Sequence, residues 1–262
     1  MKSITEFGKM KAKKEKISVV TCYDFWSAKI IDSSNIDAVL VGDSSAMVMH
    51  GFETTINATT DMMCYQVSSV KRGVKNKLII ADLPFLIHRK GAKEFYNSVD
   101  LLMKSGTNAV KIEGASGNLD LIKELVESGI PVMGHLGLTP QSIFQLGGYK
   151  IQGKDNSSSE KIFNDALLLE NSGCFAIVLE MVPSPLAKKI TDELAIPTIG
   201  IGAGPDTDGQ VLVLHDLLGL NKDFNPKFVR KYLNGYEEIL SALNNYTRDV
   251  KDNNFPSEEE SN

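Results

Sequence analysis

The chain has 262 residues, of which 42% are hydrophobic and 23% are charged, and its formal net charge is −5 at pH 7. A single α/β barrel of typically ~250 residues would use nearly all of it. The negative charge argues against a nucleic-acid partner, and no apolar stretch approaches the ~18 residues that a membrane span needs. Three widely spaced cysteines predict neither a disulfide framework nor a metal site, which is typical of a reducing compartment. We therefore expect a cytoplasmic protein without nucleic-acid or membrane partners.

Apolar, β-branched runs alternate with helical patterns along the chain. Strands are predicted at residues 17–22, 37–42, 78–82, 109–113, 131–135, 176–180, 197–201 and 211–215. Helices are predicted at 24–34, with Asp24 as a possible N-cap, and at 61–72, 92–105, 118–128, 160–172, 184–194 and 227–245. This alternation predicts parallel strands joined by right-handed crossovers, and eight such units close a (β/α)₈ TIM barrel. An open doubly wound sheet is the alternative, but no Gly-x-Gly-x-x-Gly follows the first strand.

The last part of the pattern is less regular. The connection between 197–201 and 211–215 is too short for an ordinary helix, and Asp208-Gly209 indicates a turn within it. Residues 200–204 could pass for a phosphate cradle, but no Lys-Ser or Lys-Thr follows, so tight packing beside the site is favoured. We expect one barrel domain over residues 1–262, with a flexible tail from about residue 248.

Four acidic residues each end an apolar run that reads as a buried strand: Asp43, Asp82, Glu113 and Glu180. The carboxyl ends of parallel barrel strands converge on one face, so these carboxylates should lie together. A single Asp at such a position is more often a helix N-cap. Four clustered carboxylates repel one another and lose hydration, so they are tolerable mainly where a cation or shared protons neutralise them. Because oxygen-only ligation suits Mg²⁺ rather than zinc, we infer a magnesium site.

Two basic residues lie on the same predicted strands. Lys111 stands two residues before Glu113 and therefore points to the same side of its strand. It could be a salt-bridged filler, a cation that binds an anionic substrate, or a Schiff-base lysine; substrate binding is favoured because a metal offers another electron sink. The role of His135, a satisfied hydrogen-bonding residue or a substrate contact, stays open.

Two long segments follow predicted strands. One runs from Ser44 to Ile56, and the other from Leu136 to Gly153. Long loops on the catalytic face of a barrel are usually lids or ligand walls. The Gly- and Ser-rich stretch 147–159 is the best candidate for a mobile cover.

Several motifs, taken in order, resemble ketopantoate hydroxymethyltransferase over roughly residues 3–255. They are Gly42-Asp43-Ser44, Asp82-Leu83-Pro84-Phe85, Lys111-Ile112-Glu113-Gly114, Gly134-His135-Leu136-Gly137-Leu138-Thr139-Pro140-Gln141, Gly147-Gly148-Tyr149-Lys150, Leu179-Glu180-Met181-Val182-Pro183 and Gly200-Ile201-Gly202-Ala203-Gly204. The family usually continues Gly-Asp-Ser with Leu-Gly-Met, whereas Ser45-Ala46-Met47 stands here. Because alanine does not favour positive φ, the turn after Ser44 is expected to differ slightly.

The resemblance implies an enzyme of pantothenate, and hence coenzyme A, biosynthesis. It would transfer a one-carbon unit from methylene-tetrahydrofolate to 3-methyl-2-oxobutanoate through a Mg²⁺-stabilised enolate, giving 2-dehydropantoate. By the resemblance, the metal ligands are Asp43, Asp82 and Glu113, the ketoacid contacts are Asp43, Ser44, Asp82 and Lys111, and the proton acceptor is Glu180. It also implies a barrel of the phosphoenolpyruvate-binding superfamily and a homodecamer.

Two other functions stay open as alternatives. A magnesium-dependent lyase or mutase of the same superfamily, such as isocitrate lyase, typically presents a Lys-Lys-Cys-Gly-His motif, which this sequence lacks. A non-catalytic barrel should have lost at least one of the metal-binding acids or the base, yet all four acids stand.

Overall fold

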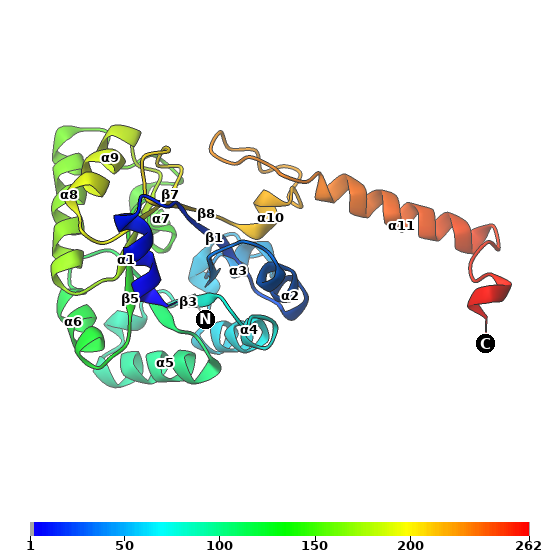
Figure 1. Ribbon diagram of the computed structural model, residues 1–262, viewed down its shortest axis with the longest axis horizontal. Coiled ribbons are helices and arrows are strands. Elements are labelled where there is room, and N and C mark those ends of the chain that lie inside the picture. Colours follow the sequence, from blue (N-terminus) through cyan, green and yellow to red (C-terminus); the bar gives the residue numbers. More distant parts are fainter. Residues whose placement is uncertain (1–2, 262) are drawn as a thin grey trace. The chain divides into compact units, whose positions relative to one another are not determined.

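The computed structural model describes residues 3–261, and their strands form one closed barrel (Figure 1). All neighbouring strands pair in parallel, in the order β1 to β8, with β8 closing on β1. The strands are β1 (Ile17–Thr21), β2 (Ala38–Val41), β3 (Leu78–Asp82), β4 (Ala109–Glu113), β5 (Val132–Gly137), β6 (Ala176–Glu180), β7 (Thr198–Ile201) and β8 (Gly209–Leu212). The predicted parallel (β/α)₈ barrel is therefore confirmed.

Helices alternate with these strands, apart from the β7–β8 connection, which is too short for one, as predicted. The longer helices are α1 (Ile4–Ala12), α2 (Phe25–Ser33), α4 (Thr60–Gly73), α5 (Ala92–Ser105), α6 (Leu119–Glu127), α8 (Asn156–Asn171), α9 (Ser184–Glu193) and α11 (Gly235–Lys251). The shorter ones are α3 (Ser45–Val48), α7 (Ile143–Leu146) and α10 (Leu214–Leu217). Asp24 caps α2 as predicted, because its side chain accepts from the Ser27 amide. None of the helices in residues 3–261 is both long enough and apolar enough to cross a membrane.

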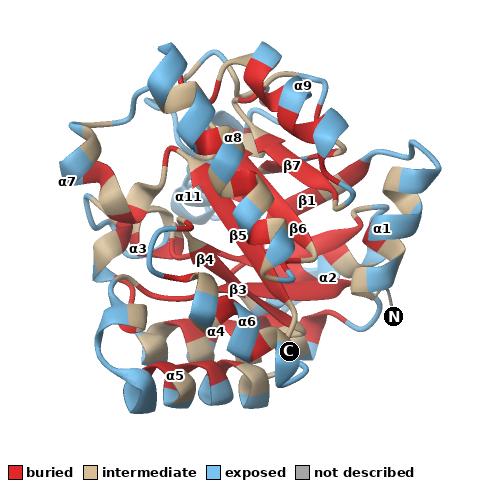
Figure 2. Cartoon of the chain, turned by 90° about the vertical axis from the view of Figure 1, so that its left-hand side faces the viewer, coloured by how far each residue is buried: buried red, intermediate tan, exposed pale blue. Residues whose placement is uncertain are grey.

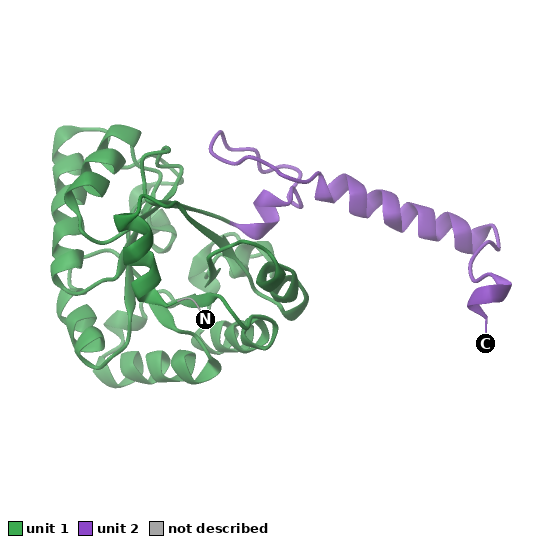
Figure 3. Ribbon diagram, in the orientation of Figure 1, with its two compact units in different colours: residues 1–212 green, residues 213–262 purple. Residues whose placement is uncertain are grey.

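The chain divides into two compact units, residues 1–212 and 213–262 (Figure 3). The first unit contains all eight strands, and the second contains α10 and α11. The single domain over residues 1–262 and the flexible tail from about residue 248 stay predictions.

The strands of the barrel are buried on both faces, which is why their sequences read as continuous apolar runs (Figure 2). The inward-facing side chains of alternate strand positions fill the interior and belong to one core cluster: Ile17, Val19, Ala38, Leu40, Leu78, Ile80, Ala109, Met133, Ala176, Val178, Ile199 and Val211. The barrel is thus a packed core, and chemistry is confined to the strand ends.

Helix α1, which the sequence did not reveal, packs its apolar face against the N-terminal end of this core. Its residue Phe7 is fully buried, joins the core cluster, and meets the Phe175 ring edge-on with 5.8 Å between centroids. One aromatic residue in a Lys-rich segment was too weak a periodic signal to predict a helix. Helix α1 thus covers the end of the barrel that lies opposite the predicted site.

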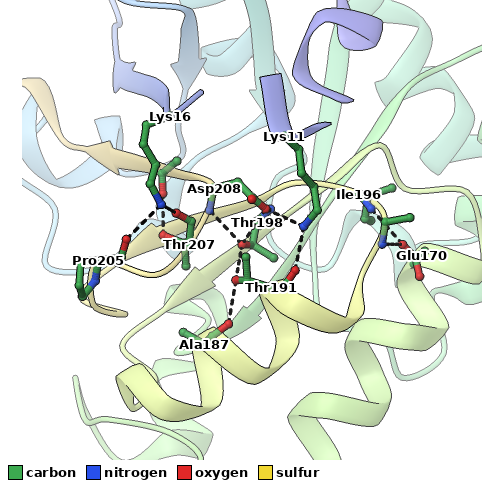
Figure 4. A network of polar contacts seen from close by, with 12 residues as sticks. Lys11, Lys16, Glu170, Ala187, Thr191, Ile196, Thr198, Pro205, Thr207 and Asp208 are labelled. Carbon is green, nitrogen blue, oxygen red and sulfur yellow. Dashed lines mark hydrogen bonds and ion pairs between the residues drawn. The ribbon is translucent and has the colours of Figure 1, made fainter. Parts of the chain in front are cut away.

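A polar network fixes α1 to the neighbouring elements (Figure 4). The Lys11 ammonium donates to Asp208 Oδ2 and to the Thr191 carbonyl, both at 2.8 Å. Asp208 Oδ2 also accepts from the Thr198 amide at 2.9 Å, and the Thr191 and Thr198 hydroxyls lie 2.6 Å apart. The Lys16 ammonium donates to the carbonyls of Pro205 and Thr207. Each of these charges is therefore matched by a nearby partner.

Three sequence predictions need correction near the end of the barrel and in the loops. The eighth strand begins at Gly209 rather than 211 and ends at Leu212, so Asp208-Gly209 leads into a strand instead of making the predicted turn. A Cβ on Gly209 would overlap the backbone carbonyl oxygen of Ile17 on the neighbouring strand β1, so close strand packing requires glycine. Residues 156–159 of the predicted cover form the first turn of α8, which Asp155 caps by accepting from the Ser158 amide at 2.9 Å.

The predicted helix over residues 227–245 is also displaced, since α11 runs from Gly235 to Lys251. The amides of Tyr232, Gly235 and Tyr236 donate to the carbonyls of Leu217, Leu218 and Gly219 at the end of α10. These bonds satisfy the end of α10 and hold residues 232–234 out of a helix.

Candidate functional site

The acidic residues at the strand ends gather at the C-terminal mouth of the barrel. In strand register, Asp82 pairs with Lys111, Glu113 with His135, and Gly137 with Glu180. Asp43 follows β2 by two residues. Asp43, Asp82, Lys111 and His135 are all buried, whereas the Glu180 side chain is 18% exposed. The mouth therefore holds a charged cluster of which Glu180 is the more accessible acid.

Lys111 and His135 connect the carboxylates. The Lys111 ammonium lies 2.9 Å from Asp82 Oδ1 and 3.1 Å from His135 Nδ1. The same Nδ1 lies 3.3 Å from Glu113 Oε1, and on the other side of the imidazole Nε2 lies 3.2 Å from Glu180 Oε2. His135 thus lies between Glu113 of β4 and Glu180 of β6 and connects the two acids.

Neither Asp43 nor Asp82 acts as the helix cap that each could have been. Asp43 Oδ2 accepts from the Gln141 amide Nε2 at 2.8 Å, and Ser44, the N-cap of the short α3, makes no side-chain cap bond. Asp82 Oδ2 accepts from the Asp43 backbone amide at 3.1 Å. Both carboxylates therefore face the mouth of the barrel.

Burial and mutual repulsion shape the protonation of the acids. Burial, followed by the charges of Asp82 and Glu113, raises the pKa of Asp43 well above its ordinary value. Burial also opposes ionisation of Glu113, but hydrogen bonding and the charges of His135 and Lys111 outweigh it and lower the pKa of Glu113. Burial first, and the two neighbouring carboxylates second, thus make Asp43 resist ionisation.

The two basic groups respond to the same cluster. Burial disfavours the Lys111 ammonium, but the charges of Asp82, Glu113 and Asp43 outweigh burial and raise its pKa, so Lys111 is a cation at neutral pH. Burial and the Lys111 charge disfavour the imidazolium of His135, yet hydrogen bonds to Glu113 and Glu180 raise its pKa to about 9. A protonated ring places its positive charge between the two glutamates; a neutral ring that accepts from Lys111 at Nδ1 carries its proton on Nε2, which faces Glu180.

Ser44 is held from two sides. Its Oγ lies 2.9 Å from the hydroxyl of the buried Tyr23, which follows β1. A Cβ on Gly42 would lie 2.7 Å from Ser44 Oγ and 3.5 Å from Asp82 Oδ2, so glycine is needed for the serine to fold back over the strand end. Sequence reasoning missed Tyr23, because a lone tyrosine after a strand carries no motif.

Gln141 is a second residue that sequence reasoning missed. Besides its bond to Asp43, its Nε2 donates to the Leu83 carbonyl at 2.9 Å, and its backbone amide donates to Glu113 Oε2 at 3.0 Å. Gln141 is buried, with 8% of its surface exposed. Gln141 is the last residue of the motif Gly134–Gln141, and its place in that motif is the sequence signal that could have marked it as a functional residue.

The donor set fits a hard divalent cation. Asp43, Asp82 and Glu113 offer only carboxylate oxygens at the ends of three adjacent strands, β2 to β4, and a cation would offset the cost that burial and the neighbouring charges place on ionised Asp43. Within residues 3–261, no group of three or more His, Cys, Asp or Glu side chains is arranged to hold a metal ion by itself, so water or substrate oxygens would have to complete the coordination. Each of the three acids directs at least one oxygen to a protein donor or cation, namely Gln141, Lys111, His135 or the Asp43 amide.

The segment after β5 reaches this mouth. Gly147 and Gly148 adopt positive φ after the short α7, and the Tyr149 hydroxyl lies 3.5 Å from Met47 Sδ. Burial, followed by the charges of Glu180, Asp43 and Glu113, raises the pKa of Tyr149. Tyr149 is therefore close enough to the acids to feel their charge.

Farther round the barrel, a Cβ on Gly200 would lie 2.7 Å from Thr207 Oγ1, so the tight packing predicted for residues 200–204 is confirmed.

Solved structures support the fold. The chain is similar to 2,3-dimethylmalate lyase, a member of the PEP mutase/isocitrate lyase superfamily, with a TM-score of 0.62 and 16% identity, covering 98% of this chain and 90% of that one. It is also similar to phosphonopyruvate hydrolase, solved with oxalate and Mg²⁺, with a TM-score of 0.64 and 10% identity, covering 99% and 93%. At such low identity these likenesses show the fold alone.

Sequence comparison is more specific. A family model described as ketopantoate hydroxymethyltransferase matches residues 1–258. The 3-methyl-2-oxobutanoate hydroxymethyltransferase of Bdellovibrio bacteriovorus is 55% identical over 261 residues, which cover 100% of this chain and 99% of that protein. Since the family model spans almost the whole chain and the relative matches it end to end, the chain belongs to the ketopantoate hydroxymethyltransferase family.

Proposed function

We propose that the chain catalyses transfer of a one-carbon unit from methylene-tetrahydrofolate to 3-methyl-2-oxobutanoate, giving 2-dehydropantoate and tetrahydrofolate in pantothenate biosynthesis. Family membership supports the activity. The observation that carries the residue assignment is the buried cluster in which Lys111 pairs with Asp82 and feels the charges of Asp43 and Glu113, while His135 connects Glu113 to Glu180. A non-catalytic barrel has no need for such a costly buried arrangement of charge.

Asp43, Asp82 and Glu113 would hold Mg²⁺. When bound, the ion supplies Lewis-acid stabilisation of the negative charge that develops on the keto oxygen of the substrate. Lys111, held as a cation, pairs with the anionic ketoacid, and the Ser44 hydroxyl offers a further hydrogen bond at the same strand end. Asp43 and Asp82 border the same space. This assignment favours substrate binding over a Schiff base for Lys111, because its amine stays protonated and is not free to attack a carbonyl.

Glu180 takes the proton from the carbon beside the ketone. It is more exposed than the other acids, and only Oε2 faces His135, so Oε1 is left to accept the proton. His135 Nε2 steadies the carboxylate, and a positioned general base typically contributes ~10²–10⁴ in rate. The substrate carbon that has lost its proton forms the new bond to the folate methylene carbon, and water supplies the hydroxyl group of the product. Both bonds from that methylene carbon to the folate nitrogens break, and the nitrogens take up the substrate proton and one proton from water, so that tetrahydrofolate leaves.

The segment from α7 to Tyr149 would cover the mouth during the reaction. Tyr149 lies within the electrostatic reach of Glu180, and its bond to Met47 joins this segment to α3. A cover excludes bulk water, which would otherwise react with the deprotonated substrate carbon. Assembly as a homodecamer and a cytoplasmic location remain predictions from resemblance and composition.

The test is an assay of folate-dependent product formation. Purified protein is incubated with 3-methyl-2-oxobutanoate and methylene-tetrahydrofolate, after EDTA treatment and with Mg²⁺ restored, and 2-dehydropantoate is followed by mass spectrometry. We expect product only when both the folate and the divalent ion are present. Absence of product under all conditions would contradict the activity, and full activity in EDTA would contradict the metal site while leaving the activity intact.

A further inference from the structure

One loop touches acids that come from three different strands. It begins where β5 ends, and there the Leu138 amide donates to the Glu180 carbonyl at 2.8 Å. Gly137 has φ +93°, and a Cβ on it would overlap the Glu180 carbonyl oxygen. Only glycine therefore allows the loop to lie this close to the backbone of the proposed base.

The same loop then turns so that the Gln141 amide faces the site. Residues Pro140–Ser142 form a single 3₁₀ turn in which the Ser142 amide donates to the Thr139 carbonyl at 2.8 Å. The first amides of such a turn have no partner within it, and that of Gln141 donates to Glu113 Oε2. The backbone of this residue thus fixes the acid of β4.

The Gln141 side chain fixes a second acid. Its Nε2 donates to Asp43 Oδ2 and to the Leu83 carbonyl. The Leu83 carbonyl can only accept, so it fixes Nε2, and not Oε1, as the end of the amide that faces Asp43. An amide orients a carboxylate without neutralising it, whereas Lys111 beside Asp82 contributes a full positive charge.

We propose that Gln141 is a positioning residue, which holds Asp43 and Glu113 at the separation and orientation that a divalent cation requires. The inference rests on the proposed metal site and adds to it a residue that is not itself a ligand. Groups that hydrogen-bond metal ligands from outside typically contribute 10–100-fold to metal affinity. Because Gln141 acts on acids of β2 and β4 at once, its loss should loosen the site rather than remove a ligand.

The test measures metal affinity in the absence of substrate. EDTA-treated protein is titrated with Mg²⁺ by calorimetry and with Mn²⁺ by electron paramagnetic resonance of the free ion. The variants are Gln141→Met, which keeps length but donates no hydrogen bond, and Gln141→Ala, which leaves room for water and guards against misfolding of the first. The matched control is Gln66→Met, since Gln66 is also buried but its amide bonds to His50 Nε2, at 3.3 Å, and not to one of the acids.

We expect the Kd for both ions to rise ~10–100-fold in each Gln141 variant and to stay near wild type in Gln66→Met. Thermal unfolding in EDTA should change no more in the Gln141 variants than in the control. A Kd within about twofold of wild type in folded Gln141→Ala, or an equal rise in Gln66→Met, would overturn the positioning role. If wild-type protein bound neither ion, the proposed metal site itself would fail, and that result is distinct from failure of Gln141 alone.

Discussion

At the N-terminal end of the barrel one lysine meets one aspartate, whereas at the C-terminal mouth one lysine faces three carboxylates. Lys11 and Asp208 pair at 2.8 Å and use their remaining capacity on the Thr191 carbonyl and the Thr198 amide. At the mouth, burial and the neighbouring charges of Asp82 and Glu113 oppose ionisation of Asp43. The same residue types therefore stabilise the N-terminal end of the barrel, whereas at the C-terminal mouth they are held in an electrostatically unfavourable arrangement. Binding of a cation and a substrate there would relieve that unfavourable energy.

The largest effect should come from Glu180→Gln. Glutamine keeps the size and one acceptor oxygen but cannot take a proton, so turnover should fall ~10²–10⁴ while the KM for the ketoacid changes little. Steady-state kinetics with saturating folate and Mg²⁺ would measure both. Glu170→Gln is the matched control, because Glu170 accepts the amides of Ala195 and Ile196 away from the mouth. Turnover within about threefold of wild type in Glu180→Gln would remove it as the base.

Lys111→Met separates substrate binding from covalent catalysis. Loss of a hydrogen bond to a charged group costs ~1.5–3 kcal/mol, so the ketoacid should bind about 10–150-fold more weakly. Calorimetry with the ketoacid and Mg²⁺ would check the affinity. Borohydride reduction of the wild-type enzyme with substrate should leave Lys111 unmodified, and a stoichiometric adduct on that residue would establish a Schiff base instead.

At the N-terminal end of the barrel, Lys11→Met should lower folding stability and leave the catalytic rate unchanged. It removes the partner of a carboxylate whose side chain is only 15% exposed, at a cost of ~1–3 kcal/mol. For a chain of this size, each kcal/mol lowers Tm by roughly 2–4 °C. The control is Lys9→Met, whose ion pair with Glu6 is exposed and should contribute only about 0–1 kcal/mol. Equal Tm values for the two variants would show that the Lys11 network contributes nothing special.

The smallest expected effect is a gain in folding stability, and it concerns Asp43→Asn measured in EDTA. Because folding raises the pKa of Asp43, the folded state carries a penalty that grows as pH rises above the ordinary value of the carboxyl. Asparagine avoids that charge and can still accept from Gln141, so the variant should be more stable by about 1 kcal/mol. The gain should be small near pH 4 and larger near pH 8, as followed by urea unfolding. A loss of stability at the higher pH would contradict this electrostatic penalty.

Sequence patterns predicted the barrel and its acids because both are encoded locally. A buried parallel strand reads as a continuous apolar run, and Asp82, Glu113 and Glu180 each close such a run. The contacts of Gln141 with Asp43 and of Lys11 with Asp208 join residues far apart in the chain, and no periodicity encodes them. The start of α11 was mistaken because backbone bonds to the end of α10 outweigh the helical propensity of residues 232–234.

We propose that the base and the cation site act together on the ketoacid in one barrel mouth, and hydrogen exchange can measure this joint action. In heavy water without folate, the enzyme should replace the single C3 hydrogen of 3-methyl-2-oxobutanoate by deuterium, so that the methyl doublet in the proton spectrum collapses. Exchange should require Mg²⁺ and slow by ~10²–10⁴ in Glu180→Gln. Exchange at the wild-type rate in Glu180→Gln, or undiminished in EDTA, would contradict the account.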